Sequence, residues 1–271
     1  MKIFLEYVSK NNTLTQQEMA DYVSQLVGRK ITRFIISRTL RKQEINRKRI
    51  TYHYKEINYE KAEEFEQEFF SLLDMPILAL DECSFHIGEA PRYGYSKRGS
   101  RVISKRTGKK SINYTLILCV ANVEKGGVVL YDLIERGMKT ENFHRFLSDP
   151  NIKSVNDEGS YLIMDNVKVH HANQACKKLG LSSIKELLAS KNIQPLYLPA
   201  YAPMLNPTEF CFNFIRHYVE KSRPETYEEL EQAISKTIDM LDEKDMRKFF
   251  QHCYFKRPGV LIMRTPTKFP S

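Results

Sequence analysis

The sequence lacks any apolar run that approaches the roughly 20 residues of a membrane-spanning helix. It also lacks a basic and then apolar leader with a cleavage site, so we expect neither a membrane anchor nor secretion. Cysteine is scarce: the five residues are scattered, odd in number and form no C-x-x-C pair. This pattern argues against a zinc site or a disulfide framework and favours a reducing compartment.

Tryptophan is absent, and there is no internal repeat or low-complexity segment. A chain of 271 residues can form one sizeable core and a small appended module. We predict a small helical domain at 1–55, a helical linker at 56–75 and a larger α/β domain at 76–271. The net charge of +9 favours a polyanionic partner.

Acidic residues are nearly missing from residues 28 to 55, which contain ten Lys or Arg and one acid, Glu44. Three short helices are expected around this basic window, at residues 1–11, 15–27 and 31–43. A Thr-x-x-Glu capping pattern at Thr15 and Glu18 begins the second helix, and Gly28 ends it. A helix, a glycine-containing turn and a basic helix together are typical of a DNA-binding helix-turn-helix.

The third helix has an apolar arc and a basic face. The arc is formed by Ile31, Phe34, Ile35, Ile36 and Leu40. The residues expected to face DNA recur at four-residue spacing and are Arg33, Ser37 and Arg41. A basic arm that suits a phosphate backbone follows, with Arg47, Lys48 and Arg49. An ordinary helical bundle with a solvated charged face fits the same residues.

Three acidic residues lie in or just after short apolar runs, which predict buried strands. They are Asp81 in ILALDECSF, Asp165 in YLIMDNV and Glu209 after LYLPAYAPMLNP. Strand-end carboxylates that meet a helix-borne carboxylate would form a site for hard divalent cations, which bind oxygen. Simpler interpretations exist: Glu209 could close a capping box with Asn206, and the aspartates could merely end their strands.

The order of elements predicts the fold class. Residues 112–135 read as two strands joined by a turn at Lys125, Gly126 and Gly127, and a strand at 77–85 precedes them. Later strands alternate with helices. We therefore predict an α/β fold, a mixed sheet flanked by helices on both faces.

Four blocks of sequence resemble transposases of the Tc/mariner superfamily, and they occur in that family's order. The blocks are LDECSFH, GYSKRGSRV, MDNVKVHH and YLPAYAPMLNPTEF. Tyr95 and Phe210 stand where the family commonly has tryptophan. The resemblance implies an RNase H-like catalytic domain with a D-D-E triad at Asp81, Asp165 and Glu209, preceded here by one helix-turn-helix.

The resemblance also implies a function. The triad would bind two Mg²⁺ or Mn²⁺ ions, with Asp81 bridging, and would catalyse cleavage and strand transfer of a DNA element. Double-stranded DNA, both transposon ends and target, would be the partner of a homodimer or larger assembly, in the nucleus of a eukaryote or otherwise in the cytoplasm. Two alternatives remain: a catalytically idle DNA-binding descendant, and an RNase H-like nuclease without strand transfer.

Further residues are candidates for supporting roles. Residues 92 to 110 contain eight Lys or Arg and no acid, and they fit a basic hairpin that holds DNA or a solvated loop. Its candidate phosphate contacts are Lys97, Arg98 and Arg101. His86, His170 and His171 could contact a phosphate or position water, or could be structural, and Asn166 could orient Asp165. Glu82 should point to the opposite face of its strand from Asp81.

Overall fold

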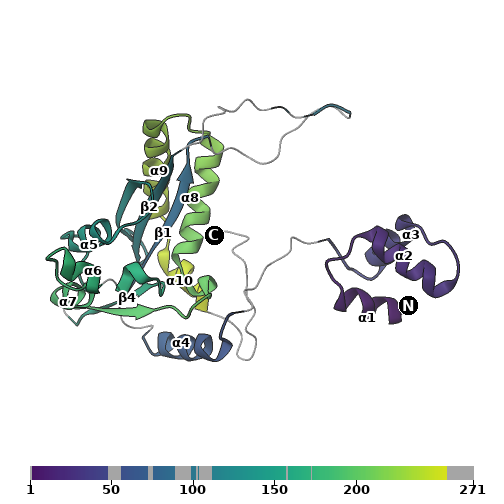
Figure 1. Cartoon of the computed structure of the whole chain (residues 1–271), viewed down its shortest axis with the longest axis horizontal. Coiled ribbons are helices and arrows are strands. Elements are labelled where there is room, and N and C mark those ends of the chain that lie inside the picture. The colour runs from purple at the N-terminus through teal and green to yellow at the C-terminus, as the bar shows by residue number, and fades with distance from the viewer. Residues whose placement is uncertain are drawn as a thin grey trace. The chain divides into compact units, whose positions relative to one another are not determined.

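The computed structural model describes residues 2–47, 56–72, 76–88, 99–101, 103, 112–156, 158–171 and 173–254. The predicted sites Lys48, Arg49, Lys97 and Arg98 lie outside these residues. The chain divides into two compact units, Met1–His53 and Tyr54–Ser271, and each is described by itself (Figure 1). Within the described residues, no helix combines the length and apolar character needed to cross a membrane.

The first unit consists of α1 (Lys2–Lys10), α2 (Gln16–Val27) and α3 (Arg33–Lys42). The predicted capping box begins α2: the Thr15 hydroxyl accepts from the Glu18 N–H at 3.2 Å, and Glu18 Oε2 accepts from the Thr15 N–H at 2.6 Å. Gly28 ends α2 at φ 65°, a left-handed conformation in which a side chain is strained. Local sequence therefore sets the bounds of this helix.

The core of the first unit is small, and α3 contributes less to it than its sequence suggests. Of the predicted apolar arc, only Ile36 and Leu40 are buried, and Ile31 is partly buried against the same cluster. Phe34 is 71% exposed and Ile35 is 49% exposed. The apolar arc is therefore only partly buried, because three short helices cover only a narrow stripe of α3.

Five strands of the described chain form one sheet in the order β3-β2-β1-β4-β5. Their bounds are β1 (Ile77–His86), β2 (Asn113–Ala121), β3 (Val128–Glu135), β4 (Ser160–Met164) and β5 (Ile193–Tyr197). The first three strands pair antiparallel, whereas β4 runs parallel to both β1 and β5. The predicted mixed sheet, including the hairpin between β2 and β3, is confirmed.

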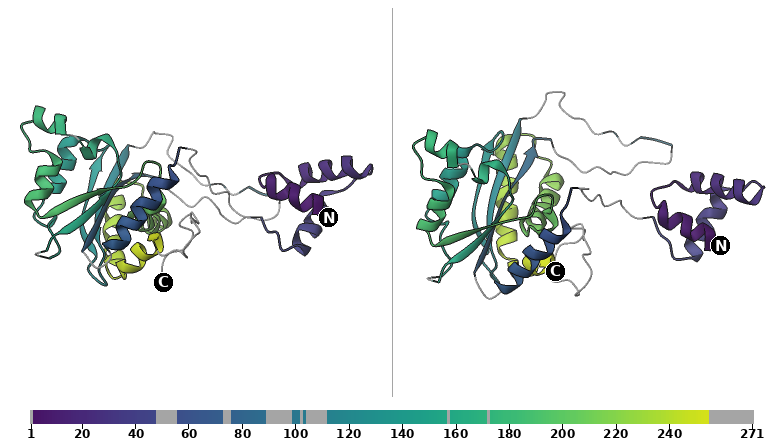
Figure 2. Two further views of the ribbon diagram at one scale, coloured as in Figure 1. Left: turned by 90° about the horizontal axis from the view of Figure 1, so that it is seen from below. Right: turned by 60° about the horizontal axis from the view of Figure 1, so that its bottom comes forward.

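Helices cover both faces of the sheet (Figure 2). One face packs against α4 (Tyr59–Ser71), α8 (Thr208–Ser222), α9 (Tyr227–Asp242) and α10 (Met246–Tyr254). The other face packs against α5 (Thr140–Ser148), α6 (Asn173–Lys178) and α7 (Ile184–Ser190). Side chains of β1 alternate between the two cores, with Ala79 in the first and Leu78 and Leu80 in the second. The segment 56–72, expected as a linker, adds Phe65 and Phe69 to the first core.

The central strand β1 pairs with its two neighbouring strands over different lengths. It pairs with β2 along its length from Leu78 to His86, but with β4 only from Ile77 to Ala79. Asp81 therefore lies within β1 and not at its end, contrary to expectation. Asp81 does lie beyond Ala79, the last residue of β1 that pairs with β4, so β4 does not pair with β1 at Asp81.

Candidate active site

Asp81 and Asp165 come together through the register of the two parallel strands. Ala79 pairs with Ile163, and the same register continued by two residues places Asp81 opposite Asp165, just after β4 ends. Asp81 has the same parity along β1 as Ala79, so its side chain lies on the face that α8 covers. Helix α8 runs beside β1, and its first turn contains Glu209 (Figure 1).

Asn206 links the first aspartate to the start of α8, a role that the sequence interpretation missed. Its amide Nδ2 donates to Asp81 Oδ2 at 2.7 Å, and its Oδ1 accepts from the Thr208 hydroxyl at 2.6 Å and from the Thr208 N–H at 3.2 Å. The Asn206 side chain is buried, so these bonds are shielded from water. The asparagine of the LNPTE motif was the available signal.

Glu209 does not close a capping box. The Asn206 N–H, which such a box would use, donates instead to the Pro203 carbonyl at 3.0 Å. Helix α8 begins at Thr208, with Pro207 before it and no side-chain cap from that residue. The capping explanation of Glu209 is therefore excluded, and its half-buried carboxylate is available to the site.

The carboxylates influence one another electrostatically. Burial raises the pKa of Asp81 well above its usual range, and the negative charges of Glu82, Asp165 and Glu209 raise it further, against a lowering hydrogen bond from the Glu82 N–H. Burial also raises the pKa of Glu209, while Arg216 lowers it. A bound cation would relieve both effects, because it stabilises ionised carboxylates.

Arg216 lies two helical turns after Glu209 on α8. Its Nη2 donates to the Cys83 thiol at 2.7 Å and to the Ser84 carbonyl at 3.3 Å, and its guanidinium lies 5.6 Å from the centre of the Phe85 ring. Burial raises the pKa of the Cys83 thiol, so the group stays neutral despite the nearby cation. Arg216 thus supplies positive charge to the acidic site from the side of α8.

Asp165 is held by His170, which lies in the short helix η1 (Lys168–His171). His170 Nδ1 lies 2.6 Å from Asp165 Oδ1 and 3.1 Å from the Asp165 backbone carbonyl, to which its hydrogen bond is aligned. Asp165 Oδ1 is buried, and the contact with Nδ1 is an ion pair without hydrogen-bond alignment. This oxygen therefore keeps capacity for a further ligand.

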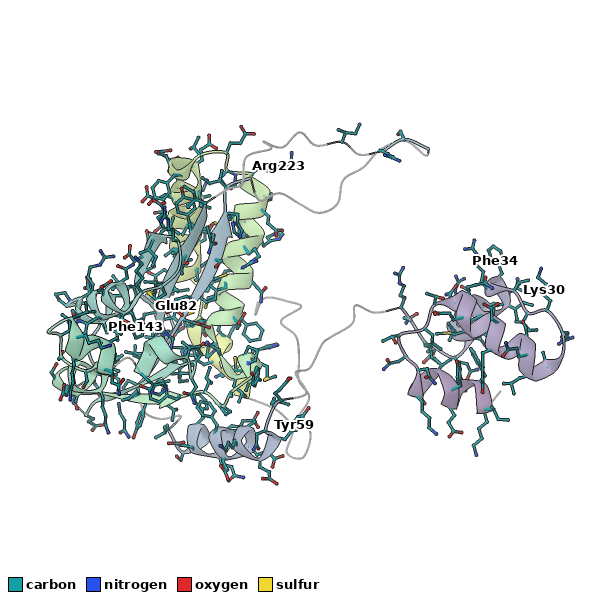
Figure 3. The ribbon with its side chains drawn as sticks, in the orientation of Figure 1. Lys30, Phe34, Tyr59, Glu82, Phe143 and Arg223 are labelled. Atoms are coloured by element: carbon teal, nitrogen blue, oxygen red, sulfur yellow. The ribbon has the colours of Figure 1, made fainter. Side chains whose placement is uncertain are left out.

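His170 also reaches across to the neighbour of Asp81. Its Nε2 lies 3.1 Å from Glu82 Oε1, and its ring stacks on Phe143 at 4.4 Å between centres; Figure 3 labels Glu82 and Phe143. Burial alone would lower the pKa of His170, but the close contact with the Asp165 carboxylate, the hydrogen bond to Glu82 and the negative charges of both raise it to about 10. The ring is therefore a charged imidazolium at neutral pH. Because its side chain is completely buried, it cannot make the phosphate contact considered above.

The other candidate supporting residues have separate surroundings. Glu82 points away from Asp81, toward the face covered by α5, as predicted from strand alternation. Asn166 Oδ1 lies 2.7 Å from His171 Nε2, so this amide contacts His171 and not Asp165, contrary to the suggested role. His86 is exposed at the end of β1.

A divalent metal site fits these residues in its chemistry. Carboxylate oxygens are the ligands that Mg²⁺ and Mn²⁺ prefer, and Asp165 Oδ1 is a buried oxygen without an aligned hydrogen bond. Across the described parts of the chain, no three His, Cys, Asp or Glu side chains are gathered closely enough to hold an ion. Ligation by all three acids would therefore require a side-chain movement from the arrangement seen here.

The predicted DNA contacts are partly described. In the first unit, Arg33, Arg41 and Arg47 are exposed, whereas Ser37 is half-buried. In the second unit, Arg101 is exposed. These positions leave the arginines accessible to a phosphate backbone, and they stay predictions as DNA contacts.

Comparisons with solved structures show similarity in the fold. The fold is similar to the Mos1 strand transfer complex (TM-score 0.65, 18% identity, 93% of this chain and 73% of that one). It is also similar to the Mos1 mariner paired-end complex with Mn (TM-score 0.64, 17% identity, 93% of this chain and 74% of that one). The paired-end complex with Mg is similar to the same degree (TM-score 0.64, 18% identity, 92% of this chain and 75% of that one). No curated protein matches the chain.

A family model supplies the stronger finding. Residues 76–231, more than half of the chain, match the family described as DDE superfamily endonuclease. Together with the Mos1 fold, this confirms the resemblance inferred from the four sequence blocks. The chain belongs to the DDE superfamily endonucleases.

Proposed function

We propose that this protein is a DNA transposase that cleaves phosphodiester bonds at the ends of a DNA element and transfers the freed strand to a target. The observation that carries the proposal is the meeting of Asp81 and Asp165 by strand register beside Glu209 at the start of α8. Membership of the DDE superfamily endonucleases and the Mos1 fold, solved as a strand transfer complex, support it.

The protein's own residues would prepare the site for metal. Asp81, Asp165 and Glu209 would hold Mg²⁺ or Mn²⁺, two ions with Asp81 shared between them, and the Mos1 complexes with these metals support this choice. When bound, such ions activate a nucleophile and stabilise the leaving oxygen of an in-line displacement. Asn206 fixes the Asp81 rotamer, and His170 fixes Asp165, so that two carboxylates are oriented before DNA arrives.

Two successive reactions would use the same carboxylates. Water would first attack the phosphodiester at the element's end and release a 3′-hydroxyl. That hydroxyl would then attack a phosphodiester of the target, so no covalent bond to the protein is needed. Arg216, beside Glu209, would limit the charge repulsion between the acidic site and the DNA backbone.

Assembly on DNA is part of the proposal. The Mos1 relatives are described as paired-end complexes, which supports a homodimer or larger assembly that holds two element ends. Light scattering of the full chain, with and without an end duplex, would measure the number of copies. A single copy on each duplex under cleavage conditions would contradict the paired arrangement.

The proposal is tested by cleavage of labelled duplex DNA that carries the repeats flanking the element. The native chain, Asp165→Ala and the exposed control Asp239→Asn on α9 are compared with Mg²⁺ or Mn²⁺. We expect nicking and joined products for the native chain and the control, and neither for Asp165→Ala. Nicking without joining would identify a nuclease, and binding without nicking would identify an idle descendant.

A further inference from the structure

The first unit exposes a large aromatic side chain that its fold does not use. Phe34 lies in the first turn of α3 and is 71% exposed, with the neighbouring Ile35 at 49%. The core side of the helix is formed by Ile36 and Leu40, so Phe34 adds nothing to the packing of the unit. Figure 3 shows Phe34 at the outside of this unit. A partner of the unit would explain an apolar ring in this position.

The surroundings of this ring are cationic. The Arg33 guanidinium lies 5.1 Å from the centre of the Phe34 ring. Arg38 and Arg41 follow Phe34 at four and seven residues, which places them along the same exposed stripe of the helix. Helix α3 has four Lys or Arg and no acid. The partner of the stripe must therefore be an anion that also offers an apolar group.

The major groove of DNA offers both. Its edges are lined by phosphates, and its floor presents the 5-methyl group of each thymine, the apolar feature of an A·T pair. The first turn of the second helix is the part of a helix-turn-helix that reaches base edges. Ser37, one of the three residues expected from sequence to face DNA, is half-buried, whereas Phe34 at the start of the same helix is open to solvent.

We propose that Phe34 reads a thymine by contact with its 5-methyl group, while Arg33, Arg38 and Arg41 bind the adjacent phosphates. The inference rests on the proposed function, since it assumes double-stranded DNA as the partner. It adds a residue that selects sequence to arginines that bind any sequence. A second copy of the chain is the other occupant that an exposed aromatic could fit, and the experiment separates the two.

The test uses thymine-to-deoxyuridine exchange, which removes one methyl group and leaves every hydrogen-bonding atom in place. A duplex is selected by the full native chain from a random pool, and each thymine is then replaced in turn. The variants are Phe34→Ala and the matched control Ile3→Ala, an apolar residue of α1 that is 66% exposed. Affinity is measured by fluorescence anisotropy, and the oligomeric state by light scattering.

We expect one or two deoxyuridine positions to weaken native binding about fourfold, the effect of one buried methyl group. Phe34→Ala should weaken binding by about tenfold and lose sensitivity at those positions, because the ring that meets the methyl is gone. Ile3→Ala should behave as the native chain. Removing the methyl group would then weaken binding of the native chain but not of Phe34→Ala, which assigns the methyl contact to the Phe34 ring.

Three outcomes would overturn the inference. Undiminished deoxyuridine sensitivity in Phe34→Ala would assign the methyl contact to another residue. A change of oligomeric state with unchanged DNA affinity would assign Phe34 to a contact between copies. Failure of the native chain to select any duplex would remove the proposed function as well, and the cleavage assay would show that loss independently.

Discussion

Asp81 and Glu82 are neighbours on β1, but strand alternation sends their carboxylates to opposite faces of one sheet and into opposite electrostatic surroundings. Asp81 faces α8, where burial and other carboxylates raise its pKa, and it accepts hydrogen bonds from two neutral donors, the Glu82 N–H and the Asn206 amide. Glu82 lies on the face that α5 covers, where the imidazolium of His170 contacts its carboxylate and stacks on Phe143.

This difference separates a carboxylate suited to bind metal from one suited to hold structure. A carboxylate without a protein cation keeps its affinity for an added cation. Glu82 is paired with the His170 imidazolium and helps to hold that ring beside Asp165. His170 joins the two faces, since its other nitrogen contacts Asp165, the residue that the strand register places opposite Asp81.

The largest effect should come from neutralising the unpaired acid. We expect Asp81→Asn to lower the rate of DNA cleavage by about a thousandfold, because the shared ligand of the proposed metal site loses its charge. The thermal midpoint without metal should not fall at pH 7, since a buried charge is removed and a similar shape remains. Calorimetry and single-turnover cleavage measure the two quantities, and a large loss of stability would refute the contrast.

Removing the imidazolium should damage both stability and activity. In His170→Ala, Glu82 and Asp165 lose their counter-charge beside an emptied space, so we expect the free energy of unfolding to fall by about 3 kcal/mol. Metal affinity should fall by roughly 10- to 100-fold through the loss of Asp165 orientation. Denaturant unfolding and metal titration measure these effects.

His171→Ala is the matched control, because this neighbouring histidine is exposed and contacts Asn166 and Tyr197. We expect its unfolding free energy and metal affinity to stay close to native. Equal losses in the two variants would show that η1 as a whole is fragile and that His170 has no particular role in positioning Asp165.

Added Mg²⁺ should stabilise only chains with an intact acidic site. At a concentration about 100 times its dissociation constant, a ligand adds about 2.7 kcal/mol to folded-state stability. We therefore expect a rise of several degrees in the thermal midpoint of the native chain and of Glu82→Gln, and none in Asp81→Asn. A shift in Asp81→Asn equal to the native one would place the metal elsewhere.

The most specific effect should appear in the pH dependence of stability. The pKa of His170 is raised from 6.5 to about 10 in the folded chain, so its pairing stabilises fully below pH 6.5 and is lost as pH rises toward 10. The stability difference between the native chain and His170→Gln should shrink over that window. Urea titrations at pH 6, 8 and 10 measure it, and a constant difference would contradict a charged His170.

Asp81 should also make the stability of the native chain fall, relative to its neutral variant, as pH rises. Its pKa is raised by folding, so its protonated form stabilises the fold below pH 3.8 and this stabilisation is lost as pH rises through the folded pKa. Without metal, Asp81→Asn should therefore gain stability relative to the native chain as pH increases from 3.8. A relative loss over the same range would mean that the Asp81 charge is favourable in the fold.

Sequence indicated the features that depend on short stretches of chain. The Thr15 and Glu18 pattern specifies the start of α2, because both hydrogen bonds form within four residues. Alternation along β1 specifies that Asp81 and Glu82 diverge, because side chains of a strand have period two. The motif blocks indicated the three acids and the family, because each block is a short continuous stretch of sequence.

Tertiary structure decided the features that depend on residues far apart in the chain. The bond from Asn206 to Asp81 spans 125 positions, and that from His170 to Glu82 spans 88, so neither follows from local spacing. Phe34 reads as core on a helical wheel, but packing of three short helices covers only a narrow stripe of α3. Sequence by itself determined which side chains have the chemistry to bind a metal ion or DNA. Only packing determined which became buried, paired or exposed, because burial and pairing are properties of neighbours that the fold brings together.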